Sequence, residues 1–144
     1  MDQRLNDCYN DFLRNDVMVF SGSYHFSGST DAAVIKCGNA WGVFLDIDKI
    51  RTPRQELHAV VHEWSHWQTD STYGLDAPPA VRAKAEETAR RAEIKKLLPF
   101  DEMRGVIKRG ITQIYELSEY FNVDEDMIRQ ALAYYTGPCG LTFA

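Results

Sequence analysis

Apolar residues in the first part of the chain follow two different periods. Between residues 3 and 15 they recur every three or four positions, which predicts an amphipathic helix. The members of this apolar stripe are Leu5, Cys8, Tyr9, Phe12 and Leu13. Residues 17–20 form a short, partly β-branched run that predicts a strand, and residues 21–31 predict a loop because they are rich in Gly and Ser.

Two further apolar runs predict a β-hairpin. Residues 33–37 and 41–45 both have the composition of strands. Between them stand Gly38 and Asn39, which adopt a positive φ at low cost, as a tight hairpin turn requires.

The residues that follow the hairpin predict the start of a helix over 53–69. Thr52 is a good N-cap, and Pro53 suits the first helical position. Gln55 stands three residues after the cap, which completes the pattern of a capping box.

The remainder of the chain predicts helices only. Residues 79–98 are rich in Ala and charged residues, and Pro99 ends that helix. Further helices are expected at 102–109, 111–121 and 125–135. This order of elements predicts an α+β fold with a small three-stranded antiparallel or mixed sheet and about five to six helices.

Composition and charge narrow the class of protein. The 144 residues fit one domain, and the net charge of −5 creates no field that gathers nucleic acid. Three cysteines without paired spacing predict reduced thiols rather than disulfides. The polar first residues lack the apolar core of a signal peptide, and no run approaches the ~20 apolar residues of a membrane helix. We therefore expect a cytoplasmic protein.

The predicted helix over 53–69 carries a pattern typical of a metal site. His62 and His66 stand four residues apart, so both imidazoles project from one helix face and can reach a single Zn²⁺ at roughly 2.0–2.1 Å. Glu63 then lies beside the metal, where it can take a proton from a metal-bound water. The HExxH spacing thus predicts two zinc ligands and one general base.

Two other histidines are not expected to bind this ion. The α-carbons of His58 and His66 lie about 12 Å apart along a helix axis, so His58 cannot join the two ligands on the same ion. We interpret His58 as a surface residue or as a residue that supports the ligands from behind. His25 falls in the Gly/Ser-rich loop, where a plain loop histidine is favoured over an oxyanion or proton-shuttle role.

A catalytic zinc site needs a third protein ligand and leaves a fourth position for water. Glu86 is the predicted ligand, because it shares a helix face with Ala89, a small residue that allows close approach to the metal helix. Glu93 lies on the same face and is the second choice. Glu87 points about 100° away and is interpreted as a solvated charge.

With these residues in place, the chain resembles the ImmA/IrrE family of zinc peptidases. That family combines HExxH with a downstream pattern of the form ExxA followed by LLxP. The residues of this chain that correspond are His62, Glu63, His66, Glu86 and Ala89, followed by Leu97-Leu98-Pro99. The resemblance covers about residues 15–135. The chain departs from the family at three places. Arg90 stands where the family has Asn or Asp, and Ala92-Glu93 replaces a Phe-Ala pair. Asp70 stands where the family often has a further histidine.

The resemblance implies a zincin-like fold and an activity. It implies that His62, His66 and Glu86 hold Zn²⁺ and that Glu63 is the catalytic base. Family members are typically encoded beside a helix-turn-helix repressor, often on mobile elements such as prophages, and they relieve repression by cleaving that repressor. The resemblance therefore implies a peptidase whose protein partner is a repressor, while the lack of a long apolar run predicts no membrane partner.

Residues 111–135 carry the spacing of a helix-turn-helix pair. The expected core of this pair is Leu117, Phe121, Val123, Ile128 and Leu132. The second helix would read DNA, but it begins with Asp124, Glu125 and Asp126, and only Arg129 follows. Three carboxylates repel phosphate and instead suit the helix dipole, so we expect structural packing or partner docking rather than nucleic-acid binding.

Two hypotheses of function remain open. The first is a zinc endopeptidase. It would form one domain over 1–144, with a catalytic core at 1–100 and a helical segment at 101–144. The strand 41–46 would accept the substrate as an added strand. The second is a non-catalytic transcriptional regulator or protein-binding module with a structural metal. A structural site has four protein ligands, whereas the sequence offers three and no nearby cysteine, which favours the enzyme.

Overall fold

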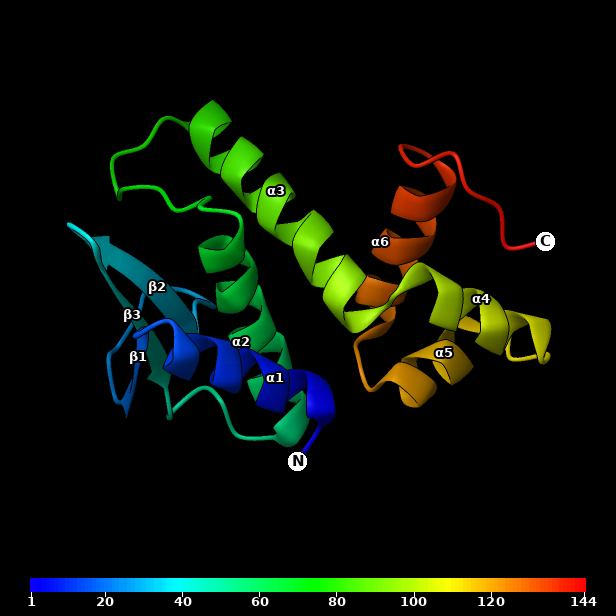
Figure 1. The fold of residues 1–144 in the computed structure, drawn as a ribbon, viewed down its shortest axis with the longest axis horizontal. Helices are drawn as coiled ribbons and strands as arrows, with labels where there is room; N and C mark the ends of the chain where they lie inside the picture. Colours follow the sequence, from blue (N-terminus) through cyan, green and yellow to red (C-terminus); the bar gives the residue numbers. More distant parts are fainter. The chain divides into compact units, whose positions relative to one another are not determined.

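The computed structural model describes all 144 residues and contains six helices and a three-stranded mixed sheet (Figure 1). The predicted α+β class is therefore confirmed. The elements are α1 (Gln3–Arg14), β1 (Met18–Gly22), β2 (Ala32–Cys37), β3 (Ala40–Asp46), α2 (Pro53–Gln68), α3 (Pro79–Leu97), α4 (Phe100–Lys108), α5 (Ile114–Phe121) and α6 (Glu125–Thr136).

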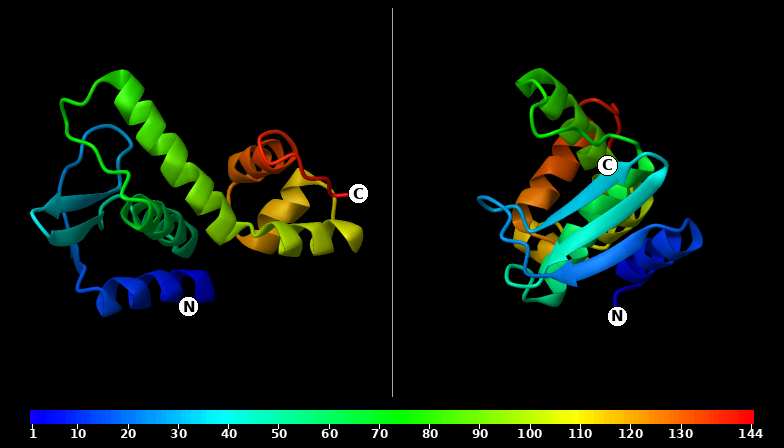
Figure 2. Two further views of the ribbon diagram at one scale, coloured as in Figure 1. Left: turned by 45° about the horizontal axis from the view of Figure 1, so that its top comes forward. Right: turned by 90° about the vertical axis from the view of Figure 1, so that its left-hand side faces the viewer.

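The sheet has the strand order β1-β3-β2, seen face-on in the right-hand view of Figure 2. Strands β2 and β3 form the predicted antiparallel hairpin, with Ala32 opposite Leu45 and Gly38 in the turn at a φ of 61°. Strand β1 pairs with β3 in parallel, with Met18 opposite Gly42. Strand β3 is therefore central, and β1 and β2 are the edge strands.

The central position of β3 corrects one prediction. Residues 41–46 cannot accept a substrate as an added strand, because β3 already pairs with a strand on each side. Only an edge strand has unpaired backbone groups to offer. The parallel pairing of β1 with β3 is what encloses β3, and β2 is the edge strand of the hairpin.

Helix α2 packs against β2 and β3, and α1 packs against α2 and β1. The capping box predicted for α2 is present, since the Thr52 hydroxyl accepts from the Gln55 N–H and the Gln55 side chain accepts from the Thr52 N–H. In α1, Leu5, Cys8 and Phe12 are buried as predicted. Leu13 is 77% exposed, so its place in the stripe was wrong. It follows Phe12 by one residue and lies about 100° around the helix.

The chain forms two compact units, Met1–Arg90 and Arg91–Ala144, and each is described by itself. In the second unit, four of the five residues expected as the core of the helix pair are buried, and Leu132 is half-buried. Helix α5 begins at Ile114 rather than 111, because Gln113 has an extended backbone. No helix of the chain combines the length and apolarity needed to cross a membrane.

Candidate metal centre

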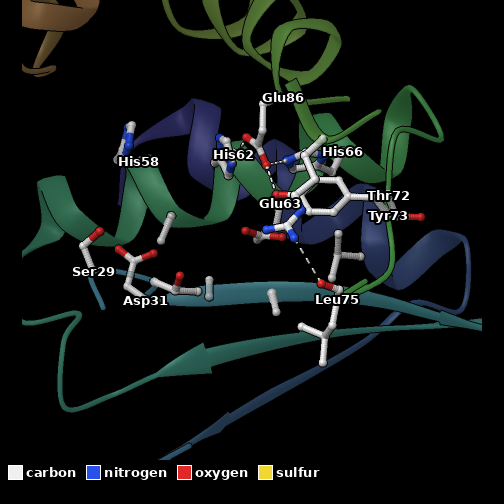
Figure 3. A pocket seen from close by; sticks show the side chains of 16 residues that line it. Ser29, Asp31, His58, His62, Glu63, His66, Thr72, Tyr73, Leu75 and Glu86 are labelled. Carbon is white, nitrogen blue, oxygen red and sulfur yellow. Dashed lines mark hydrogen bonds and ion pairs between the residues drawn. The ribbon is translucent and has the colours of Figure 1, made fainter. Parts of the chain in front are cut away.

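Three side chains of the first unit come together as possible metal ligands. His62 and His66 project from α2, one turn apart, and Glu86 reaches them from α3 (Figure 3). The Nε2 atom of His62 lies 3.4 Å from Oε2 of Glu86, and Nε2 of His66 lies 3.2 Å from Oε1 of Glu86. All the ligand atoms of this group lie within 4.8 Å of one another.

These distances fit a divalent metal ion. Ligand atoms that surround zinc tetrahedrally at 2.0–2.1 Å are about 3.3–3.4 Å from each other, and the 3.4 Å between Nε2 of His62 and Oε2 of Glu86 matches this spacing. Two imidazoles and one carboxylate form a donor set that suits Zn²⁺, although other divalent ions of the first transition row also accept it. The structure therefore assembles a possible metal-binding triad from the three residues predicted as ligands.

Glu63 lies next to the triad of His62, His66 and Glu86, as Figure 3 shows. Its side chain is only 6% exposed. Burial raises the pKa of the Glu63 carboxyl, and the charges of Glu86 and Asp31 raise it further, while His62 and His66 act in the opposite direction. A carboxyl group with a raised pKa holds a proton more readily than an exposed glutamate does.

The charge balance within the triad keeps Glu86 ionised. Hydrogen bonds with His62 and His66, together with one from Tyr73, hold the pKa of Glu86 far below its usual range. Burial of His66 opposes its charged form, but the hydrogen bonds with Glu86 and with the backbone of Ser71, together with the charge of Glu86, outweigh that effect and leave the pKa of His66 raised. The carboxylate is thus already an anion facing two imidazoles, as a ligand for a cation must be.

A cavity of about 650 Å³ opens beside these residues. One wall is helix α2, with Glu63 and the two histidines, and the opposite wall is the edge strand β2 with the loop before it. Lining residues outside the predicted site are Ser29, Thr30, Asp31, Ala32, Ala33, Val34, His58, Ala59, Thr72, Tyr73, Leu75 and Arg82. The cavity therefore joins the triad to an unpaired strand edge.

The structure separates the predicted site residues from the other candidates. Glu93 is buried but does not belong to the triad, so the second choice for the third ligand is not favoured. Glu87 forms an ion pair with Arg90, as expected of a charge on the helix surface. His58 is exposed and lies one turn before His62, with ring centroids 6.3 Å apart. His25 is in a loop, at a φ of 55°.

Sequence reasoning missed Tyr73, Asp31 and Arg82 as residues of the cavity. All three lie outside the HExxH helix, and two of them belong to irregular segments where no periodic pattern exists. The only signal available for Tyr73 was an aromatic residue in the segment between the two ligand-bearing helices.

Comparison of the chain with models of protein families, with curated proteins and with solved structures finds no match.

Proposed function

We propose that the chain is a zinc-dependent endopeptidase of the ImmA/IrrE type, with a zincin-like active site, that cleaves a helix-turn-helix repressor. The observation that carries the proposal is the convergence of His62, His66 and Glu86 at 3.2–3.4 Å, with Glu63 buried next to them on the wall of one cavity. A set of three protein ligands is typical of a catalytic zinc site, because a structural site has four.

The residues divide the work of peptide hydrolysis. Zn²⁺ held by His62, His66 and Glu86 would supply positive charge that polarises the scissile carbonyl and makes a water molecule easier to deprotonate. Glu63 accepts the proton of the attacking water and then donates it to the leaving nitrogen. Glu63 thus carries one proton from the water to the nitrogen, and the C–N bond breaks as that proton is transferred.

The substrate is proposed to bind as an added strand along β2. The N–H of Asp46 donates to the carbonyl of Asp31, so Asp31 belongs to a hydrogen-bonded pair of the hairpin. Such pairs alternate in antiparallel strands, which directs the backbone groups of Ala32 and Val34 away from β3. Both residues line the cavity opposite the triad. A peptide paired with this edge would run past Glu63.

Helices α5 and α6 are proposed as the surface that docks the repressor. Asp124, Glu125 and Asp126 at the start of α6 are exposed, and they disfavour binding to nucleic acid. The same acidic positions complement the basic surface with which a repressor approaches DNA. Selectivity for one protein substrate would then come from docking rather than from the cavity alone.

The proposal predicts that a helix-turn-helix repressor is encoded next to this chain, and that repressor is the substrate to test. The zinc-loaded protein is incubated with that repressor, and mass spectrometry is expected to find two defined fragments. The Glu63→Gln variant is the matched control, because it should retain the metal and the fold but lose cleavage. An intact repressor, together with zinc content that is unchanged in the His62→Ala, His66→Ala double variant, would reject both the activity and the site.

A further inference from the structure

The segment that follows α2 turns back onto the triad. Asp70 has a φ of 49°, in the left-handed region, which reverses the chain directly after the helix. Ser71 is thereby brought against the side chain of His66, which lies in the last turn of α2. Residues 71–73 therefore lie beside the ligands although they belong to no regular element.

Ser71 and His66 are joined by two reciprocal hydrogen bonds. The Ser71 N–H donates to the His66 carbonyl at 3.0 Å, and Nδ1 of His66 lies 2.9 Å from the Ser71 carbonyl oxygen. A carbonyl oxygen can only accept, so Nδ1 carries the proton. Nε2 is then the nitrogen that would give up its proton to bind a metal, and without the metal it donates to Oε1 of Glu86 at 3.2 Å. The Ser71 carbonyl thus selects the tautomer of His66 that can bind a metal.

Tyr73 contacts Glu86, the residue that faces both His62 and His66. Its hydroxyl donates to Oε1 of Glu86 at 2.7 Å, and its ring lies 6.3 Å from that of His66. The two oxygens of Glu86 therefore have different neighbours, since Oε2 faces His62. A hydrogen bond between an exposed tyrosine and a glutamate ordinarily stabilises little, but this glutamate also faces two histidines.

The far side of the same loop is also fixed. Arg82, on α3, donates through Nε to the Ala77 carbonyl at 2.9 Å and through Nη2 to the Leu75 carbonyl at 3.3 Å. Tyr73 stands between this anchor and the Ser71–His66 pairing. Its position is thus determined from both sides, which allows one hydroxyl group to hold the Glu86 carboxylate in a single orientation.

We propose that residues 71–73 form the outer shell of the metal centre, in which Tyr73 is a positioning residue that holds Oε1 of Glu86 and leaves Oε2 to bind the ion. This inference rests on the metal site of the proposed function but not on peptidase activity. Outer-shell partners of metal ligands commonly change metal affinity by 10–100-fold when they are removed.

The test measures zinc affinity by competition with a chelator, in wild type and in Tyr73→Phe. The variant is expected to bind Zn²⁺ about 10–100-fold more weakly. Tyr115→Phe is the matched control, because Tyr115 lies on α5, is 63% exposed and should leave the affinity unchanged. The Co²⁺-loaded proteins provide a second readout, since the visible absorption of bound Co²⁺ depends on its ligand geometry.

A double-mutant cycle shows whether Tyr73 acts through Glu86. In a Glu86→Ala background, Tyr73→Phe should change zinc affinity by less than about twofold, because the partner is gone. An equal loss in both backgrounds, or no loss in the wild-type background, would overturn the proposal. If the wild-type triad binds zinc but no repressor is cut, the peptidase proposal fails while this one stands. If the triad binds no zinc, both fail.

Discussion

Replacing Lys49 by Met should loosen the loop that forms one end of the cavity. The Lys49 ammonium donates to three backbone carbonyls, those of Phe26 at 2.6 Å, Gly28 at 3.0 Å and Thr30 at 2.8 Å. Met retains most of the aliphatic stem but has no donor. The loop therefore loses the one side chain that ties its three carbonyls together, directly before the edge strand β2 begins.

The magnitude follows from how far each bond is shielded from water. A hydrogen bond to a charged group contributes about 1.5–3 kcal/mol where it is buried. The bond to Phe26 is partly buried, but those to Gly28 and Thr30 are exposed, and water can replace the ammonium there. We therefore expect a loss of about 1–2 kcal/mol in the free energy of unfolding, or roughly 3–10 °C in Tm.

Urea denaturation and amide hydrogen exchange would check this prediction. Exchange should accelerate mainly over residues 26–31, because the loss is local, while zinc affinity should stay unchanged. Lys84→Met, at an exposed position of α3, is the control and should alter neither quantity. Exchange over residues 26–31 that remains at the wild-type rate would refute the role assigned to Lys49, even if Tm falls.

Three further predictions address the site and the second unit. Glu63→Gln should lower kcat for repressor cleavage by about 10²–10⁴-fold with metal content unchanged, because Gln cannot accept the proton; a kcat near wild type would remove Glu63 as the base. Val34→Pro should fold and raise KM, because the Val34 N–H points away from β3, whereas Ile35→Pro should lower Tm strongly, because the Ile35 N–H faces β3. If the two variants change KM and Tm to the same extent, the assigned strand edge is wrong. Burial raises the pKa of Tyr135 to about 12, so the neutral phenol stabilises the fold fully below pH 10, and this stabilisation is lost between about pH 10 and 12. Tyr135→Phe leaves the Leu98 carbonyl without its donor and should cost about 1 kcal/mol in the free energy of unfolding at pH 7, but it should lose less stability at alkaline pH. An alkaline stability profile identical to that of the wild type would exclude Tyr135 as the cause of the alkaline loss.

The elements predicted best were those with local signals. The start of α2 is encoded in Thr52, Pro53 and Gln55, whose side chains and backbone interact within one turn. The spacing of His62 and His66 places them on one helix face in any α-helix, so their proximity needed no tertiary information. Glu86 was found by a facing argument along α3, which also relies on helix geometry.

The features that sequence reasoning did not find depend on contacts between distant segments. Nothing in residues 17–20 indicates that β1 pairs with β3 in parallel, because strand pattern specifies a face but not a partner. Leu13 was assigned to the buried stripe because residues at adjacent positions both fit a broad apolar face. Tyr73 reaches Glu86 only because Asp70 turns the chain after α2, and that turn has no strong sequence signature.

The origin of each part of the site determines which measurable quantity it should control. The ligands and their proposed outer shell come from α2, from the loop after it and from the first turns of α3, so changes there should alter metal affinity. The proposed substrate edge is strand β2. Its position is fixed by its pairing with β3 and by the loop that Lys49 holds, so changes in β2 should alter KM. Glu63 belongs to α2 but is not a ligand, so its loss should alter kcat alone. Tyr73→Phe, Val34→Pro and Glu63→Gln therefore form a set in which each variant should move one quantity and leave the other two near wild type. A single variant that moves all three would show that the cavity is one cooperative unit rather than three separable parts.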